Sequence, residues 1–332
     1  MLNTGALHHG GIMVNYQCNA ACRHCLYSCS PTRRGGYLSG ESAEEICRLL
    51  REGGCRSVHI GGGEPFLDFD GLLMAVRKLN QAGITLEYIE TNAFFAAGSS
   101  NRAGEYLGRL MAEGVDTLCI SVDPYHAEYV PYGAPLALAE LCGKTGMGFF
   151  LWKQEYISAL SGLAPDQKHS RREMEKALSR DYIGGTARFY GIAYGGRAIN
   201  IEREFAGCGK LYPAERFALE KSPCTNLLTT GHFHVDMDCH FIPPRCTGIR
   251  IPLREAAFGI PGGKYPAFEA LYHGGLSALL ELALRQGFSP DVGGYTSKCN
   301  LCFFIRGFLC EKGFAELDGE HYLEALKYYG DT

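Results

Sequence analysis

Two kinds of segment alternate through the first two hundred residues of this 332-residue chain. Short runs rich in β-branched or aromatic residues are typical of strands, and the longer runs between them carry apolar residues at helical spacing. We predict strands at 12–16, 57–60, 85–90, 117–122, 148–153 and 187–193, and helices at 42–53, 69–82, 101–113, 135–145 and 170–180. Repeated strand–helix pairs imply right-handed crossovers and a parallel sheet, so the predicted fold class is α/β.

The overall charge and hydropathy exclude several classes of partner. A net charge of −4 gives no bulk attraction to nucleic acid, and we expect no nucleic-acid partner. The first ten residues lack the basic start and apolar core of a secretory signal, and no apolar run reaches the roughly 18 residues of a membrane span. We therefore expect a cytoplasmic protein without membrane contact. Fifteen cysteines in a reducing compartment indicate metal or redox chemistry rather than disulfides.

Three of these cysteines, Cys18, Cys22 and Cys25, fall in one short loop after the first predicted strand, at a C-x3-C-x2-C spacing. Three thiolates can hold a cubane iron–sulfur cluster with one iron open, or a zinc ion that takes a fourth ligand. The spacing alone does not choose between them. Cys29 follows three residues further on. As a fourth ligand it would close the site, and otherwise it is a free thiol on the segment that leads into the first helix.

A glycine run, Gly61-Gly62-Gly63-Glu64-Pro65, comes directly after the second predicted strand. With this run and the cysteine loop together, the chain resembles the radical S-adenosylmethionine (radical SAM) enzymes. The resemblance implies a [4Fe–4S] cluster on the three cysteines, with SAM chelated at the open iron. It also implies a partial (β/α)6 barrel, which we expect over residues 1–200. Gly62 and Gly63 let the backbone approach the cofactor, and the Glu64 carboxylate is expected to bind the methionine ammonium of SAM.

Further matches follow the next two predicted strands. Thr91 and Asn92 resemble the start of the family's Thr-Asn-Gly turn, with Ala93 in the glycine position. Ser121 and Asp123 resemble the Ser-x-Asp that many relatives carry on the ribose side of the cofactor. Because ligands gather at the carboxyl ends of parallel strands, we expect all four residues at the cofactor site. Residues 194–198 resemble a Gly-Arg-Ala turn of relatives with a C-terminal cluster domain, although a simple glycine turn explains them nearly as well.

The loop after the fourth predicted strand departs from the commoner family pattern, because it continues from Asp123 into a proline and then aromatic and charged residues. Tyr125, His126 and Glu128 are our candidates for proton transfer at the mouth of the barrel. The alternative is an ordinary aromatic loop that packs onto the barrel rim.

A second group of cysteines occupies the last third of the chain. It resembles the auxiliary-cluster extensions, called SPASM or twitch domains, of peptide-modifying radical SAM enzymes, and we expect residues 201–332 to form a smaller cysteine-rich α+β domain. Residues 235–246 look like the strand pair of those domains, and helices are predicted at 267–287 and 320–329. One auxiliary [4Fe–4S] cluster fits the cysteine count, with zinc as the rival. The expected ligands are Cys224, Cys246, Cys299 and Cys302, with Cys310 able to replace one. Cys47, Cys55, Cys119 and Cys142 are expected to be small core residues.

The resemblance implies an enzyme that cleaves SAM reductively to a 5′-deoxyadenosyl radical, which abstracts hydrogen from a substrate. The auxiliary cluster favours a peptide or protein side chain, in post-translational modification or peptide maturation. A small molecule or cofactor precursor is the alternative substrate, and an iron–sulfur or zinc carrier without SAM chemistry is the alternative function. A flavodoxin or ferredoxin is the expected electron donor.

Overall fold

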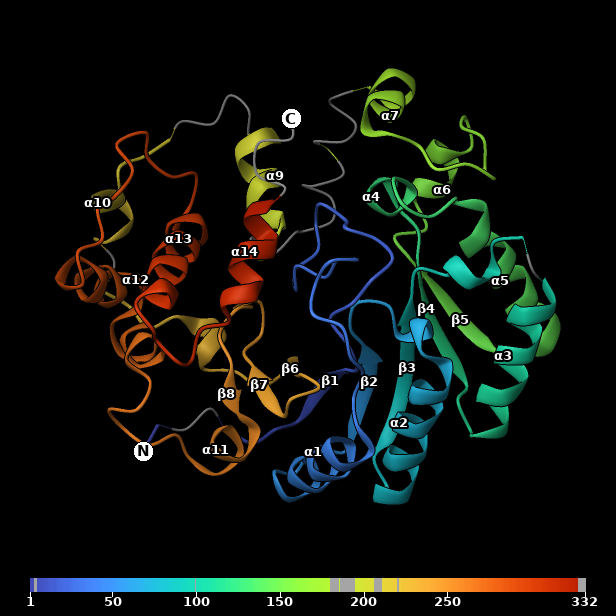
Figure 1. The fold of residues 1–332 in the computed structure, drawn as a ribbon, viewed down its shortest axis with the longest axis horizontal. Helices are drawn as coiled ribbons and strands as arrows, with labels where there is room; N and C mark the ends of the chain where they lie inside the picture. Colours follow the sequence, from blue (N-terminus) through green and yellow to red (C-terminus); the bar gives the residue numbers. More distant parts are fainter. Residues whose placement is uncertain are drawn as a thin grey trace.

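The computed structural model describes residues 1–2, 5–98, 100–179, 185, 195–205, 211–219 and 221–327. Within these residues one sheet runs in the order β5-β4-β3-β2-β1-β6-β7-β8 (Figure 1). Its strands are β1 (His9–Met13), β2 (Ser57–Gly61), β3 (Thr85–Thr91), β4 (Thr117–Ser121), β5 (Gly148–Trp152), β6 (Phe233–Val235), β7 (His240–Ile242) and β8 (Ile251–Pro252).

Each pair of neighbouring strands from β5 through β1 to β6 is parallel. The sheet does not close, since β5 and β8 are its edges in the part of the chain described. This confirms the predicted α/β class. The first five strands lie in chain order, so their carboxyl ends share one edge of the sheet. At β1 and β2 the register pairs His9 with Ser57 and Met13 with Gly61. The loops that follow these two strands, which carry the cysteine and glycine motifs, therefore start side by side.

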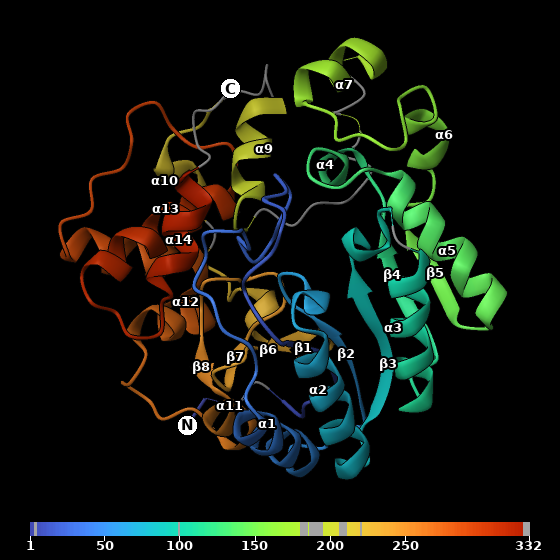
Figure 2. The same cartoon turned by 45° about the vertical axis from the view of Figure 1, so that its right-hand side comes forward.

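Helices α1 (Gly40–Glu52), α2 (Phe69–Ala82), α3 (Ser100–Ala112) and α5 (Gly133–Thr145) connect successive parallel strands and cover the outer face of the sheet (Figure 2). The first half also contains the shorter elements η1 (Pro65–Leu67), η2 (Phe94–Ala96), α4 (Pro124–Ala127), α6 (Tyr156–Leu160) and α7 (Arg171–Leu178). Local sequence explains where they begin and end. Asp68 caps α2 by accepting a hydrogen bond from the N–H of Gly71, and Gly83 ends it at φ +66, in the left-handed region that glycine tolerates.

The predicted elements of this half are confirmed to within a few residues. The largest displacement is in the first strand, which was predicted at 12–16 and lies at His9–Met13. The predicted strand at 187–193 lies outside the described residues. Leu49, Leu72, Leu107 and Leu138 on the outer helices pack with Ile60 and its neighbours in one continuous core, and burying this apolar surface against the sheet is the main force that holds the barrel wall together.

The C-terminal part adds α9 (Ala198–Phe205), α10 (Ala214–Phe217), η3 (Thr225–Leu227), α11 (Leu253–Phe258), α12 (Pro266–Arg285), α13 (Lys298–Glu311) and α14 (Gly319–Lys327). The predicted strand pair is confirmed as the antiparallel β6–β7 hairpin. Cys239 in its turn has φ +65, in the left-handed region that favours glycine. Because β6 also pairs in parallel with β1, the hairpin extends the N-terminal sheet. The division into residues 1–200 and 201–332 stays a prediction. No helix among the described residues is long and apolar enough to cross a membrane.

Candidate active site

A cavity of about 640 Å³ opens where the carboxyl ends of the parallel strands meet, a size within the roughly 300–1,000 Å³ range of ligand pockets. It brings together most of the residues singled out in the first half of the sequence: Cys18, Cys22, Cys25, Gly62, Gly63, Glu64, Thr91, Asn92, Ser121 and His126. Three other candidates from the sequence, Asp123, Tyr125 and Glu128, are described by the structure but do not line the cavity.

The cysteine loop is closed at its base, where Cys18 donates its backbone N–H to the Ser30 carbonyl at 3.1 Å. Burial raises the pKa of the Cys18 thiol well above its usual range. Cys25 differs, because a hydrogen bond from the Cys29 thiol and the charge of Arg197 lower its pKa to about 5 even though it is buried. The loop thus holds one cysteine that is ready to be a thiolate, the form that binds iron.

Cys29 is 2% exposed and lines the same cavity. Its backbone N–H lies 3.3 Å from the Cys25 sulfur, and its thiol donates to that sulfur while its own pKa is raised well above the usual range by this bond and by burial. The Cys29 sulfur therefore lies beside that of an expected ligand, and its interpretation as a free thiol stays a prediction.

A turn that is distant in sequence supports the cysteine loop from behind. Arg197 donates its backbone N–H to the Cys25 carbonyl and its Nε–H to the Cys22 carbonyl, both at 3.1 Å, and its Nη2 to the Cys29 carbonyl. Gly196 has φ +53, and a Cβ there would lie 2.3 Å from the Leu26 carbonyl oxygen. The Gly-Gly-Arg turn therefore holds the cysteine loop.

The glycine run makes its close approach to the chain that follows β1. A Cβ on Gly63 would lie 2.0 Å from the Gln17 carbonyl oxygen, and one on Gly62 would lie 2.8 Å from that of Asn15. Asn15 completes the junction, because its Nδ2 donates to the Glu64 carbonyl at 2.9 Å and its Oδ1 accepts from the Gly63 N–H at 3.0 Å. The glycines are thus required by backbone packing. Contact of Gly62 and Gly63 with the cofactor stays a prediction.

The Glu64 carboxylate joins the ends of β2 and β3. Oε1 accepts from the Phe66 N–H at 3.1 Å and from Thr91 Oγ1 at 2.9 Å, and Oε2 accepts from the Asn92 N–H at 2.8 Å. Burial nevertheless raises its pKa to about 7. A carboxylate offers about four acceptor positions, so one position on Oε2 remains for a cation such as an ammonium group.

The turn after β3 carries one residue in a conformation that disfavours a side chain. Asn92 donates from Nδ2 to Asn19 Oδ1 at 2.9 Å, and the same nitrogen lies 3.8 Å from the Cys18 sulfur. Ala93, which follows, has φ +62 and is fully buried. The position that matches the family's glycine therefore has the left-handed backbone for which glycine is suited.

The loop after β4 builds a charged pair beside the cysteines. The buried Asp123 carboxylate accepts from the backbone N–H groups of Tyr125 and His126 and lies 2.6 Å from His126 Nδ1. Although burial opposes ionisation, His126 and His24 hold the pKa of Asp123 well below its usual range. Burial likewise opposes a charged His126, yet Asp123 and the Cys22 thiol raise its pKa well above the usual range.

The two other proton-transfer candidates, Tyr125 and Glu128, make a ring contact and an ion pair within the protein. Tyr125 is buried, and His24 stacks on its ring at 4.8 Å between centroids. Glu128 pairs with Arg23 of the cysteine loop at 3.3 Å. Of the three candidates only His126 faces the cavity. The catalytic roles of all three stay predictions.

The structure brings together only part of the second cysteine group. Cys224 and Cys246 share a hydrogen bond between their thiols, which lowers the pKa of Cys224 to about 6, and Cys302 interacts electrostatically with Cys224. Cys299, one turn earlier on α13, is exposed. Cys310 is eight residues beyond Cys302 on the same helix, about 12 Å along its axis at 1.5 Å per residue, and its thiol lies 3.4 Å from the Leu317 carbonyl.

Sequence reasoning missed several residues that build the site, among them Asn15, Arg33 and Glu90. Arg33 is fully buried, donates to the Tyr27 carbonyl at 2.9 Å and pairs with Asp318 at 2.6 Å, which ties the cysteine loop to the C-terminal part. Its position two residues before a Gly-Gly pair gives no signal of burial. Cys119, expected in the core, is buried in the cavity wall, while Cys47, Cys55 and Cys142 are core residues as expected.

Comparison with known proteins agrees with this geometry. Residues 12–145 match the Radical SAM superfamily model. The "Putative peptide biosynthesis protein YydG" of Bacillus subtilis (strain 168) is 32% identical over 121 residues, 36% of this chain and 37% of that protein. The "Probable GTP 3',8-cyclase" of Methanothermobacter marburgensis is 32% identical over 81 residues, 24% of this chain and 26% of that protein. The chain thus matches about a third or less of the length of these relatives.

Among solved structures, that of BtrN in complex with AdoMet and 2-DOIA superposes with a TM-score of 0.45 at 14% identity, over 83% of this chain and 90% of that one. The family match spans the cysteine loop, the glycine run and the ends of β3 and β4, and this part of the chain belongs to the Radical SAM superfamily.

Proposed function

We propose that this chain is an enzyme that cleaves SAM reductively and uses the resulting 5′-deoxyadenosyl radical to abstract hydrogen from a peptide or protein side chain. The observation that carries the proposal is the shared cavity: Cys18, Cys22 and Cys25 line it together with Glu64, Thr91 and Asn92. A metal carrier needs the three cysteines. It does not need the buried Glu64 carboxylate beside them, which has one hydrogen-bond acceptor position left for a ligand.

The residues present fit a [4Fe–4S] cluster with SAM. Three cysteines on one loop face a common space, and Cys25 already has a lowered pKa. A cluster bound there supplies the electron that breaks a carbon–sulfur bond of SAM. The protein holds the loop in place through Arg197, offers Oε2 of Glu64 to the methionine ammonium, and places Ser121 at the end of β4 for the rest of the cofactor.

His126 and Asp123 give the site a proton-transfer pair. Because Asp123 holds Nδ1 of His126 at 2.6 Å, the ring orientation is fixed and its proton affinity is raised. We propose that His126 moves a proton at the substrate, with Asp123 as its positioning residue and Tyr125 and Glu128 as the packing around them. In this proposal Asp123 acts through His126 rather than by direct contact with SAM.

A peptide substrate is favoured by the match to a protein described by the words "peptide biosynthesis". The shorter match to a GTP cyclase keeps a small molecule or cofactor precursor as the second candidate. A flavodoxin or ferredoxin is the proposed electron donor. We propose a reducing compartment, the cytoplasm, because the described cysteines are all free thiols.

We propose an auxiliary metal centre on Cys224, Cys246 and Cys302. The three thiols influence one another electrostatically, and the buried Arg306 beside Cys302 favours thiolates there. Cys299, one helical turn from Cys302, is the proposed fourth ligand of an iron–sulfur cluster or of zinc. Cys310, about two helical turns beyond Cys302 on α13, is the proposed substitute for one of these ligands.

The substrate class is tested by incubating the reconstituted enzyme, SAM and reductant with short peptides encoded beside its gene. A mass change in a peptide, matched by 5′-deoxyadenosine, supports a peptide substrate. If SAM is cleaved while every peptide keeps its mass and a small molecule changes mass instead, the substrate is a small molecule or cofactor precursor.

A further inference from the structure

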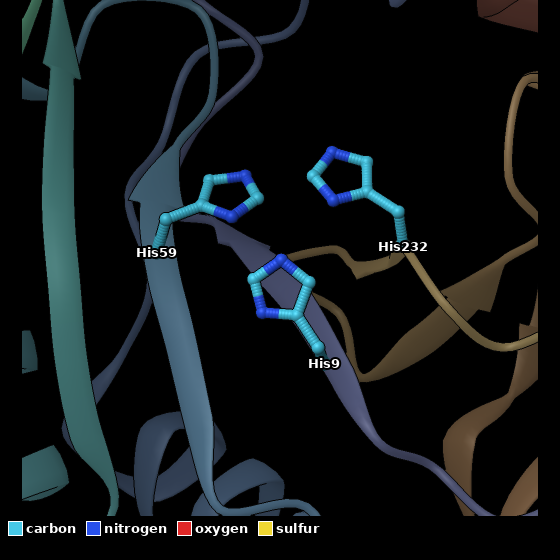
Figure 3. A group of neighbouring side chains, drawn as sticks. All are labelled: His9, His59 and His232. Atoms are coloured by element: carbon cyan, nitrogen blue, oxygen red, sulfur yellow. The ribbon is translucent and has the colours of Figure 1, made fainter.

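A group of histidines lies in the barrel interior, away from the cysteine loop. His9 stands at the start of β1, His59 in the middle of β2 and His232 just before β6, and one ring nitrogen from each lies within 4.8 Å of the others. Figure 3 shows the three imidazoles around a common space, with a nitrogen of each ring turned toward it. Neighbouring strands of the sheet order β2-β1-β6 bring them together, although His9 and His232 are more than 200 residues apart in the sequence.

His9 is oriented as a metal ligand would be. Its Nδ1 lies 3.0 Å from Oε1 of Glu87 on β3, so Nδ1 carries the proton that this bond requires. The lone pair is then on Nε2, which points to the shared space in Figure 3. A histidine held by a carboxylate on one nitrogen and offering the other is the usual arrangement around bound metal ions.

His59 supplies the second lone pair. Its side chain is fully buried, and its Nδ1 has no hydrogen-bond partner among the described residues. The Gly10 carbonyl lies near this imidazole and raises its pKa, against the larger effect of burial. Nε2 lies 3.1 Å from Nε2 of His234, and in the tautomer in which His59 donates this bond, Nδ1 of His59 is an acceptor that a metal ion can bind. A buried nitrogen without a partner costs free energy unless something binds it.

The surrounding chain is built to hold these rings. A Cβ on Gly11 would lie 2.3 Å from His59 Nε2 and 2.7 Å from His234 Cδ2, so a glycine is needed where the ring pair crosses β1. Burial, with the neighbouring imidazoles, lowers the pKa of His59 to about 3 and lowers that of His232. Both rings are therefore neutral at pH 7, the form that binds metal ions.

From this geometry we propose that His9, His59 and His232 bind a divalent transition-metal ion, for which zinc is the probe. Imidazole ligands suit zinc, copper, iron and nickel. Nitrogens at about 2.0–2.1 Å from a tetrahedral zinc are roughly 3.3 Å apart, so each ring needs to move inward by on the order of 1 Å or less.

The proposed ion has an open position toward the active-site cavity. His232 and His234 line that cavity together with the three loop cysteines, and three protein ligands with one open position are typical of catalytic rather than structural zinc. The ion would therefore hold an oxygen or nitrogen donor, such as a carboxylate, of the substrate at the end of the cavity away from the cysteines. This role rests on the proposed function, whereas metal binding does not.

The test measures zinc on anaerobically reconstituted protein without SAM, so that the loop cysteines are occupied. Zinc per chain is counted after desalting, and affinity is measured against a chromophoric chelator. We expect His232→Gln, which changes an exposed side chain, to bind one zinc fewer than wild type or to bind it at least about 100-fold more weakly. Glu87→Gln, which removes the carboxylate behind His9, is expected to weaken binding about 10- to 100-fold. His8→Gln, at the exposed neighbouring histidine, is the matched control and keeps wild-type binding.

X-ray absorption at the zinc edge identifies the ligands. We expect a nitrogen or oxygen shell near 2.0 Å that disappears in His232→Gln, whereas zinc on the C-terminal cysteines gives sulfur near 2.3 Å. Equal zinc uptake by wild type and His232→Gln, or no uptake by wild type, overturns the site. A separate assay of 5′-deoxyadenosine distinguishes the two claims: zinc bound without SAM cleavage contradicts only the proposed function, and SAM cleavage without zinc contradicts only the metal site.

Discussion

The backbone N–H of Arg197 donates to the carbonyl of Cys25 at 3.1 Å, which joins the cysteine loop to a turn more than 170 residues further along the chain. The contact requires Gly196, since a Cβ there would lie 2.6 Å from the same carbonyl oxygen. The loop that would hold the cluster is therefore shaped by a segment outside the matched 12–145 region.

Replacing Gly196 with alanine tests this support. The left-handed backbone costs about 1–2 kcal/mol for a residue with a Cβ, and the clash with Cys25 and Leu26 adds to it. We expect Gly196→Ala to lower the free energy of unfolding by at least about 2 kcal/mol and to reduce the iron retained after reconstitution, as measured by denaturant unfolding and iron analysis. Gly108→Ala in α3, where a Cβ meets no atom within 4 Å, is the control and should stabilise the protein by roughly 0.5–1 kcal/mol. Equal effects of the two substitutions would contradict the supporting role.

Ala93 offers the opposite substitution. Its φ of +62 is costly for alanine, so we expect Ala93→Gly to raise the free energy of unfolding by about 1 kcal/mol. Ala103→Gly, at a buried position of α3, should lower it by about as much, because glycine weakens helices. Chemical denaturation of both variants measures the difference. A loss of stability in Ala93→Gly would show that the left-handed conformation is not strained.

The fold of the first half follows closely from the sequence because each element has a local signal. The Asp68 cap and the Gly83 stop place α2 at the predicted residues. The cavity lining was also predictable, since Glu64, Thr91 and Ser121 each follow a parallel strand and parallel strands end at one edge. The pairing of β6 with β1 was not, because a three-residue strand carries no signal of its partner. For the same reason the meeting of His9, His59 and His232 could not be foreseen.

The buried Glu64 gives the cluster-free protein a distinctive pH dependence. Its pKa is raised from 4.5 to about 7 by burial, so the folded state binds a proton more tightly than the unfolded state. The stabilising effect of this proton is complete below about pH 4.5 and is lost as the pH rises through about 7. We expect the free energy of unfolding of wild type to fall between these values by on the order of 2–3 kcal/mol more than that of Glu64→Gln. Urea unfolding of both proteins across this range measures the two slopes, and parallel slopes would contradict the raised pKa.

The roles of Cys302 and Cys310, both on α13, are distinguished by replacing each with alanine. Because Cys302 interacts with Cys224 and Cys246 and Cys310 does not lie with them, Cys302→Ala should lose the auxiliary metal and all product while still forming 5′-deoxyadenosine. Cys310→Ala should keep both metal and product. Metal analysis and product assays of the two variants provide the measurement. Loss of metal in Cys310→Ala would instead assign that cysteine to the centre.

The central claim is that Cys18, Cys22 and Cys25 hold the cluster that cleaves SAM. It is tested most directly by anaerobic reconstitution of wild type and Cys22→Ala, followed by iron and sulfide counts and an assay of 5′-deoxyadenosine with SAM and a strong reductant. Cys47→Ala, at a buried cysteine of α1, is the matched control. We expect about eight irons per wild-type chain if the auxiliary centre is a second [4Fe–4S] cluster, or about four if it is zinc. We expect wild type and Cys47→Ala to form 5′-deoxyadenosine and Cys22→Ala to form none. A fully loaded wild-type protein that forms no 5′-deoxyadenosine, or undiminished formation by Cys22→Ala, would contradict the account.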